Sequence, residues 1–593
     1  MTLDQILISA LLVIALVLFV LGRPRYDLVA LGTLIAGVVL GLVPAKDAFS
    51  GFGHDAVITV AAVLAISRAL ALTGALEPLT SLVRKASANT VTHILVLCGI
   101  GAVISAFMNN VGALALLMPI AIQSTIKAGR SPAGVLMPLA FSTVLGGMVT
   151  LIGTPPNVIV SGFRAQAVGE PYHLLDFAWV GLPAALAGLV YMALLGWRLI
   201  PGDRLGKGAV ADLMDVGAYM TELTVKPGSS LIDRTVGEAE ASWTDSDLTV
   251  VGLIRDDRRI FGAMARQKIA EGDVLLVRGE SEAITRRARA AGLDFAASER
   301  PSAEHLQSQD VVMAEVVVGV GSPLIGRHAG ELGLRETYGI NLLALSREGA
   351  AIRSRLGRVR MQIGDVLLLQ GDARRLQAVM ADLRCLPLVE RDIIKHDQRR
   401  GRIALGLFGA GIALAASGLL PAAVAFAIVV LGLVVSNALP VRELYTGIEW
   451  PVIVLLGAMI PIGAALETTG VTGLIADGIV GLGGDVPVWV LLAALLVVTM
   501  TLSDILNNAA TAVIMAPISI AVAQGIDVSP DPFLMAVAIG ASSSFLTPIG
   551  HQNNALVMGP GGYHFGDYWR VGLPLEIVVA VVSVPLLLLF WPL

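Results

Sequence analysis

The chain alternates long apolar runs with short polar loops, and most of the runs are long enough to cross a lipid bilayer. A transmembrane helix needs about 20 mostly apolar residues. Five such runs precede a polar central region, at 4–21, 26–43, 56–76, 134–165 and 176–200. Five more follow it, at 403–419, 421–437, 450–468, 532–560 and 570–592. This pattern predicts an α-helical polytopic membrane protein with ten crossings.

Two further apolar stretches, 91–126 and 488–524, are each interrupted by adjacent asparagines. The interruptions read Met108-Asn109-Asn110 and Leu506-Asn507-Asn508. Amides are costly in hydrocarbon unless they find polar partners, and irregular backbone is tolerated there only inside protein or beside a cavity. We therefore expect each stretch to be a re-entrant hairpin, so that each half has five crossings and one hairpin.

The basic residues agree with this topology. Lysine and arginine collect in cytoplasmic loops, and with re-entrant hairpins one set of alternate loops holds only Lys46 and Arg164. The other set holds Arg23, Arg25, Arg84, Lys85, Lys127, Arg130, Arg198, Arg204, Arg399, Arg400, Arg402, Arg442 and Arg570. We expect a multi-pass protein of the bacterial inner membrane, with the polar central region in the cytoplasm and both termini outside.

The two halves repeat polar, glycine and proline positions at a nearly constant offset. The offset is 398 residues for four pairs: Ser105 and Ser503, Asn109 and Asn507, Asn110 and Asn508, and Pro119 and Pro517. The offset is 397 residues for three more: Thr150 and Thr547, Gly153 and Gly550, and Asn157 and Asn554. An odd number of crossings inverts the second copy, so we expect inverted repeats with the binding site between them near the bilayer midplane. A duplication without a shared site is the alternative.

The second repeated element breaks a transmembrane helix. Residues 153–157 read Gly-Thr-Pro-Pro-Asn and interrupt the run at 134–165, and residues 547–554 interrupt the run at 532–560. Proline removes a backbone donor and forces the chain out of the helix. Broken helices leave carbonyl groups for a cation and amide groups for an anion. Pairing each hairpin tip with a break predicts two oxygen-rich pockets, whereas a single Asn or Ser alone would only join helices.

Composition narrows the class further. The 593 residues are 55% hydrophobic and 15% charged, and the net charge of -5 includes no basic cluster suited to nucleic acid. Two cysteines give no disulfide framework. We expect no enzyme, because no metal cluster, nucleophile elbow or phosphate loop occurs in the sequence. Lipid is the expected main solvent.

The paired tips and the Gly-Thr-Pro-Pro-Asn break resemble the divalent anion sodium symporters, the family of dicarboxylate, citrate and sulfate transporters. The resemblance implies sodium-coupled symport of a small anion, sulfate or a di- or tricarboxylate, without a prosthetic group. The implied sodium ligands are Ser105, Asn109, Asn110, Gly153, Ser503, Asn508 and Gly550. The implied substrate contacts are Asn109, Asn110, Val111, Thr154, Pro155, Asn507, Asn508, Ala509, Thr511, His551 and Gln552.

The polar central region contains its own duplication. Residues 222–238 return as 315–331, and both copies end in a Gly-Asp turn before an apolar strand, at Gly272-Asp273 and Gly364-Asp365. Alternating apolar positions indicate two small α+β modules. They resemble the C-terminal (TrkA-C/RCK-C) domains of regulators of potassium conductance, which implies a homodimer and a small regulatory ligand such as a cyclic dinucleotide. The alternative is that the modules only stabilise a dimer.

The expected organisation is therefore an N-terminal membrane repeat (1–200), two modules (201–300 and 301–400) and a C-terminal membrane repeat (401–593). A second hypothesis is a cation/proton antiporter or an arsenite-type extruder, which should carry carboxylates in the membrane core. The sequence shows one candidate, Asp504. A potassium-linked channel is a third hypothesis, but the chain lacks the selectivity-filter sequence of such a channel. Arg68 is open between a functional role and pairing with a cytoplasmic carboxylate.

Overall fold

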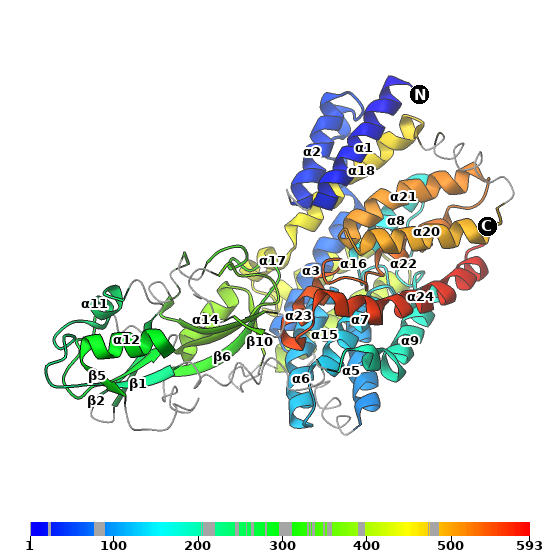
Figure 1. Ribbon diagram of the computed structural model, residues 1–593. Helices are drawn as coiled ribbons and strands as arrows, with labels where there is room; N and C mark the ends of the chain where they lie inside the picture. The colour runs from blue at the N-terminus through cyan, green and yellow to red at the C-terminus, as the bar shows by residue number, and fades with distance from the viewer. Residues whose placement is uncertain are drawn as a thin grey trace.

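The protein consists of two groups of apolar helices with a β-rich insert to one side (Figure 1). The computed structural model describes residues 2–21, 25–75, 89–202, 204, 220–243, 248–255, 258–261, 266–278, 281–295, 311–328, 331–332, 334, 338–347, 350–352, 359–388, 398–471, 474 and 486–593. Arg23, Arg84 and Lys85 of the charge argument lie outside these residues.

The helices coincide with the apolar runs. The first half contains α1 (Leu3–Leu21), α2 (Tyr26–Val39), α3 (Asp55–Leu72), α5 (Thr90–Ser105), α6 (Asn110–Lys127), α7 (Ala133–Gly147), α8 (Pro155–Val168) and α9 (Ala178–Leu194). The second half contains α15 (Gln398–Ala416), α16 (Ala422–Val435), α17 (Val441–Gly447), α18 (Trp450–Thr468), α20 (Val488–Ser503), α21 (Asn508–Gly525), α22 (Asp531–Ala541), α23 (Gln552–Gly561) and α24 (Tyr568–Phe590). Short 3-10 helices are η1 (Ala45–Asp47), η2 (Ser50–Gly53), η3 (Gly196–Leu199) and η7 (Phe565–Asp567).

Four helical segments are long and apolar enough to cross a membrane: Ala45–Leu72, Asn110–Lys127, Asn508–Gly525 and Phe565–Phe590. A fifth candidate is α17 followed by α18, which are bent by 57°. The other apolar helices among the described residues are shorter, at 10–17 residues. The chain is thus a mostly helical membrane protein, and the count of ten crossings remains a prediction.

The stretch 91–126 folds back on itself. Near its two ends, the Arg130 Nη1 donates to Thr90 Oγ1 at 2.6 Å, and His93 Nε2 lies 2.9 Å from Ser124 Oγ. These contacts join the start of α5 to the end of α6, so the two helices form a hairpin whose turn carries Asn109.

Both predicted helix breaks are present. The run at 134–165 divides into α7 and α8, with Pro155 as the first residue of α8, and the run at 532–560 divides into α22 and α23. The proline in the first break fits the new helix start because its missing N–H is unneeded there.

The insert folds into two five-stranded sheets with the same topology. The first has the order β3-β2-β4-β1-β5 and the second the order β8-β7-β9-β6-β10. The first sheet comprises β1 (Met220–Val225), β2 (Thr249–Arg255), β3 (Arg258–Phe261), β4 (Val274–Arg278) and β5 (Leu293–Phe295) with α11 (Val236–Ala241) and α12 (Ser281–Ala291). The second comprises β6 (Val311–Val318), β7 (Asn341–Arg347), β8 (Ala350–Ala351), β9 (Val366–Asp372) and β10 (Cys385–Pro387) with α14 (Ala373–Asp382).

The Gly-Asp turns explain why the duplication is visible in the sequence. Asp273 and Asp365, both almost fully buried, each accept two hydrogen bonds from an arginine, Arg255 and Arg347 respectively. Each aspartate also accepts from a backbone N–H at three residues' distance. Such charge-assisted pairs fix the turn in each copy.

The second sheet also packs on the membrane helices. Val317, Val366 and Leu388 belong to the main hydrophobic core of the helical part. Gly364, in the left-handed region at φ 83°, lies against α23, and a Cβ on Gly364 or on Gly559 would collide with the other segment's backbone. Strand β6 contacts α23, as can be followed in Figure 1. The two sheets meet each other through Leu276, Met313, Leu343 and Leu368.

Candidate functional site

The first predicted tip lies where α6 begins. Asn109 caps the helix, its side-chain oxygen accepting from the Val111 N–H at 3.0 Å. Its amide nitrogen donates to Glu449 Oε1 at 2.7 Å. Glu449 lies at the bend between α17 and α18, so this capping residue of the first half is tied to the second half.

Asn110 is the centre of the first half-site. With its amide nitrogen toward the break, it donates to Ser105 Oγ at 2.7 Å, Gly153 O at 3.2 Å and Thr143 O at 3.3 Å, and its oxygen accepts from His551 Nε2 at 3.2 Å. With the amide reversed, its oxygen faces those three oxygens and accepts from the Ser105 hydroxyl. The predicted residues Ser105, Asn110 and Gly153 are therefore within contact distance of one another.

Asn508 occupies the equivalent place in the second half. Its Oδ1 accepts from Ser503 Oγ at 3.1 Å and from Ser544 Oγ at 3.0 Å. Asn507 caps α21 as Asn109 caps α6, accepting from the Ala510 N–H. Gly550 packs so closely on this turn that a Cβ would lie 2.9 Å from Asp504 Cα.

The two breaks make matching hydrogen bonds, and in each break the threonine bond reaches the hairpin. The Thr150 hydroxyl donates to the Ala106 carbonyl, and the Thr547 hydroxyl donates to the Asp504 carbonyl. The Asn157 amide donates to Gly147 O and Thr150 O, and the Asn554 amide donates to Ser544 O and Thr547 O. The residues that repeat in the sequence thus make repeated contacts.

The two half-sites contact each other. His551, the N-cap of α23, reaches Asn110, and the Asn553 amide donates to Asn110 O at 3.0 Å and to Thr143 Oγ1 at 2.7 Å. A cavity of about 30 Å³ beside Asn109 is lined by Gly153, Thr154 and Pro155. The N-termini of α6, α8 and α23 therefore meet here, and helix N-termini attract anions.

Several buried polar atoms around the site have no partner. They are Thr154 Oγ1, Asn508 Nδ2, Asn553 Oδ1 and Asn554 Oδ1. An unpaired buried polar atom costs about 1–3 kcal/mol. Their gathering at two half-sites is typical of a place where a ligand supplies the missing partners.

Other predicted contacts are less well placed. Val111 and Ala509 offer only backbone at the tips, and the Thr511 hydroxyl donates to Asn507 O within its own helix. Gln552 is exposed. The sequence-based reading missed Glu449, Thr143, Ser544 and Asn553, because their roles depend on contacts between segments far apart in the chain.

The sequence-based prediction of one carboxylate in the membrane core is incomplete. Asp504 was the one candidate, but Glu576 lies inside α24 and is 8% exposed, and Glu449 contacts Asn109. Glu576 is a lone acidic residue in a long apolar run, and such a residue is easy to overlook in the sequence. Arg68 pairs with Glu443 at 2.8 Å, which settles its partner as a carboxylate of the second half.

Comparison with known proteins identifies the family. A family model described as citrate transporter matches residues 16–540. The chain belongs to the citrate transporter family. One relative is an uncharacterized transporter, sll0640, of Synechocystis. It is 33% identical to this chain over 98% of the chain and 96% of its own length.

Two algal relatives have more informative names. A putative sulfur deprivation response regulator of Chlamydomonas reinhardtii is 30% identical over 93% of the chain and 96% of its own. A probable sodium/sulfate cotransporter 3 of the same alga is 22% identical over 91% of the chain and 83% of its own. Among solved structures, the Alcanivorax borkumensis YdaH transporter aligns over 99% of each chain with a TM-score of 0.45 and 14% identity.

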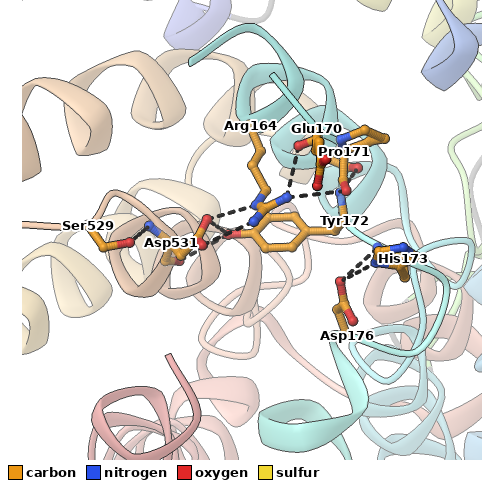
Figure 2. Close-up of polar contacts among 9 residues, drawn as sticks. Arg164, Glu170, Pro171, Tyr172, His173, Asp176, Ser529 and Asp531 are labelled. Atoms are coloured by element: carbon orange, nitrogen blue, oxygen red, sulfur yellow. Dashed lines mark hydrogen bonds and ion pairs between the residues drawn. The ribbon is translucent and has the colours of Figure 1, made fainter. Parts of the chain in front are cut away.

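Ion pairs also join the two halves of the transporter, one of them near the end of α8 (Figure 2). Arg164 donates to Asp531 Oδ1 at 2.8 Å and Oδ2 at 3.2 Å, and its guanidinium lies 4.7 Å from the centre of the Tyr172 ring. The Tyr172 hydroxyl donates to Asp531. Arg204 similarly pairs with Asp567 at 3.1 Å. These ion pairs connect elements of the first half to elements of the second.

Proposed function

We propose that this transporter carries out sodium-coupled symport of a small oxyanion, sulfate or a di- or tricarboxylate, by alternating access. The observation that carries the proposal is the meeting of three helix N-termini with neutral amides and unpaired buried polar atoms. Positive helix ends without competing basic side chains suit an anion that must be released again. The names of the algal sodium/sulfate relatives support sulfate and sodium.

The sodium ions belong with the oxygen clusters of the half-sites. In the first half, Ser105 Oγ, Thr143 O and Gly153 O all lie within 3.3 Å of the same amide atom of Asn110. Carbonyl, amide and hydroxyl oxygens at unwound backbone are the ligands that transporters offer to sodium. Ser503, Asn508 and Gly550 take the same roles in the second half, and the substrate contacts are those of the two tips and breaks together with Thr154 and His551.

Binding at two inverted half-sites would couple ion and anion to alternation between inward-open and outward-open states. A ligand shifts such an equilibrium only through different affinities for the two states. The inner-membrane location, a cytoplasmic insert and outside termini fit the basic residues of alternate loops. The insert's two sheets have the same topology, which supports two similar modules, proposed to be TrkA-C/RCK-C-like, at 201–300 and 301–400. A homodimer and a small ligand such as a cyclic dinucleotide are what the resemblance to such modules implies.

The test is a radiotracer competition panel in proteoliposomes. Sulfate uptake is measured with unlabelled sulfate, succinate, citrate or phosphate as competitor, with and without sodium. We expect uptake only with sodium and competition by the carried anion. Sodium-independent uptake would remove the sodium assignment, and absence of uptake for all four anions would overturn the substrate class.

A cation/proton antiporter or an arsenite-type extruder is the second candidate. The observation that favours it is the presence of two buried carboxyl groups, Asp504 and Glu576, and of the half-buried Glu449 in the helical part. Counter-transport of protons against sodium, without any anion, would select this candidate over the symporter.

A further inference from the structure

Glu449 is a half-buried carboxyl group that contacts the first hairpin tip. Its Oε1 accepts from the amide nitrogen of Asn109 at 2.7 Å. Within the described part of the chain, this is its only side-chain hydrogen bond. The offset of 396 residues that relates Gly74 to Gly470 also relates Gly53 to Glu449. The carboxyl group therefore belongs to one tip only and is not part of the repeat.

Packing on both sides fixes the place of Glu449, which lies at the 57° bend between α17 and α18. α18 packs closely on η2, since a Cβ on Gly457 would lie 2.6 Å from the ring of Phe52. On the other side of the bend, Glu443 of α17 is paired with Arg68 of α3 at 2.8 Å. The Glu449 carboxyl group thus extends toward the tip from a well-packed support.

The bond to Glu449 determines which atom of the Asn109 amide is available to a ligand. The amide oxygen accepts from the Val111 N–H at 3.0 Å and is turned toward its own helix. The nitrogen carries two N–H groups, and one of them points at Glu449. Asn109 makes no other side-chain hydrogen bond with the residues that the structure describes. The second N–H is the group left for a ligand.

This amide lines a cavity together with a second unused polar group. The cavity of about 30 Å³ is lined by Asn109 and Thr154, and the Thr154 Oγ1, in a side chain only 2% exposed, has no partner. An oxyanion accepts hydrogen bonds from N–H and O–H groups, whereas a sodium ion binds oxygen atoms and is repelled by the hydrogen of an N–H. An amide N–H and a hydroxyl at one cavity suit the oxygen of an anion.

We propose that Glu449 is a positioning residue of the anion site, which holds Asn109 so that an amide N–H, and not the amide oxygen, faces the cavity. The sequence resemblance implied both a sodium and an anion role for Asn109, and the proposal selects the anion. It rests on the proposed symport, because it assigns a role within that site. The orientation of the amide is independent of transport and is tested separately.

The first experiment measures uptake kinetics of full-length variants in proteoliposomes, with the radiolabelled anion that the panel selects from sulfate, succinate, citrate and phosphate. Glu449→Ala should raise the KM for the anion about tenfold, on the order of the value of one hydrogen bond, without changing the sodium concentration for half-maximal uptake. Glu449→Gln keeps an accepting oxygen and should rescue the KM to within about twofold. Glu443→Ala, which removes a carboxyl group of α17 that contacts Arg68, is the matched control and should leave both quantities unchanged.

The second experiment measures hydrogen exchange at the start of α6 in lipid nanodiscs, without transport. We expect faster exchange of the Val111 N–H in Glu449→Ala than in the wild type or in Glu449→Gln. The double variant Asn109→Asp/Glu449→Gln restores the bond with donor and acceptor exchanged, so exchange should match the wild type. Its KM should stay raised, because an oxygen now faces the cavity. This variant also serves as the test should Glu449→Ala fail to fold.

Three results would overturn the proposal. Equal impairment of Glu449→Gln and Glu449→Ala would show that the charge matters and not the accepting oxygen. A changed sodium requirement with an unchanged anion KM in Glu449→Ala would make Asn109 a sodium ligand. Recovery of the KM in the double variant would show that the N–H does not contact the anion. Absence of wild-type uptake for all four anions, with the expected exchange at Val111, supports the amide orientation and refutes the proposed symport.

Discussion

Asn110 and Asn508 are the residues on which the two half-sites depend. Each is the first residue of a hairpin helix and is bonded to the serine five positions before it. Both were visible in the sequence because a pair of amides inside an apolar run is rare and because the pair repeats. Their partners across the halves, His551 and Asn553, became visible only in the structure, since contacts over more than 440 residues leave no local pattern.

We predict that Asn110→Ala and Asn508→Ala each abolish uptake, because each change removes the central oxygen and amide of a half-site. Folding and membrane insertion should be kept, since both side chains, although buried, lie among polar groups at the start of a hairpin helix. Proteoliposome uptake and size-exclusion elution are the measurements. Ser417→Ala, at an exposed hydroxyl bonded within its own helix, is the control. Near wild-type uptake in both Asn variants would refute the site.

A second residue-scale prediction concerns Glu315 of β6, in the insert. Burial raises the pKa of this carboxyl from its ordinary 4.5 to about 7, and its Oε2 has no partner. A raised folded-state pKa means that its contribution to stability is complete below about pH 4.5 and is lost as the pH rises through 7. Hydrogen exchange of the second sheet should therefore become faster between pH 5 and 8 than the chemical effect of pH alone explains.

Glu315→Gln is expected to remove that additional pH dependence. Glu222→Gln, at the matching position of the first sheet, serves as the control and should leave the second sheet unchanged. Equal pH dependence of the second sheet in the wild type and in Glu315→Gln would contradict the assignment.

At the scale of elements, hairpins and breaks followed from residue types that cannot continue a helix in lipid. Proline and repeated asparagine mark where α6 and α8 begin, and the Gly-Asp turns mark strands β4 and β9. The lengths of the helices and the packing of the second sheet on α23 did not follow, because they depend on which surfaces meet. Glu576 was missed for the same reason, since its burial depends on the helices that pack against α24.

The Arg164–Asp531 ion pair joins α8 to α22, and we predict its contribution to the stability of the protein. Removing one partner of a largely buried ion pair leaves the other charge uncompensated, so Arg164→Gln should destabilise the protein by about 3 kcal/mol. The side chains are 15% and 17% exposed, which places the pair in that class. Thermal unfolding in nanodiscs is the measurement.

The double variant Arg164→Gln/Asp531→Asn should recover part of the lost stability, because it leaves no unpaired charge. Arg198→Gln, at an exposed arginine over Trp197, is the control and should change little. A double variant less stable than Arg164→Gln would show that the pair is not the reason for the loss.

At the scale of the whole molecule, the insert is separate from the binding residues in sequence. We predict that replacing residues 209–395 by a flexible linker leaves a membrane-inserted protein that still binds its anion but transports at a different rate. The reason is that every residue of the two half-sites lies outside that range. Anion binding and uptake rate are measured on the same preparation, and a well-folded deletion without any binding would show that the insert builds the site.

The proposed inverted topology gives a prediction of sidedness. A cysteine introduced at Gly129, after α6, should label from the cytoplasm, whereas one at Gly525, at the end of α21, should label from outside. Equivalent positions of an odd-span duplication face opposite sides, and Lys127 and Arg130 flank the first position while no basic residue lies between Gln524 and Pro532. Labelling of both from one side by an impermeant reagent would refute the inverted arrangement.

The contact between Gly364 and Gly559 has a mechanical consequence. α23 has ten residues and is thus about 15 Å long, with Gly559 near one end and His551 capping the other. A short helix is stiff. A displacement of the second module would therefore move His551 along the helix axis toward or away from Asn110, without a change in the conformation of α23. Because glycine at both contact points lets backbone press on backbone, little of that displacement is absorbed by side-chain rotation. Under the proposed mechanism, we expect the insert to change the transport rate while every ligand of the site stays the same.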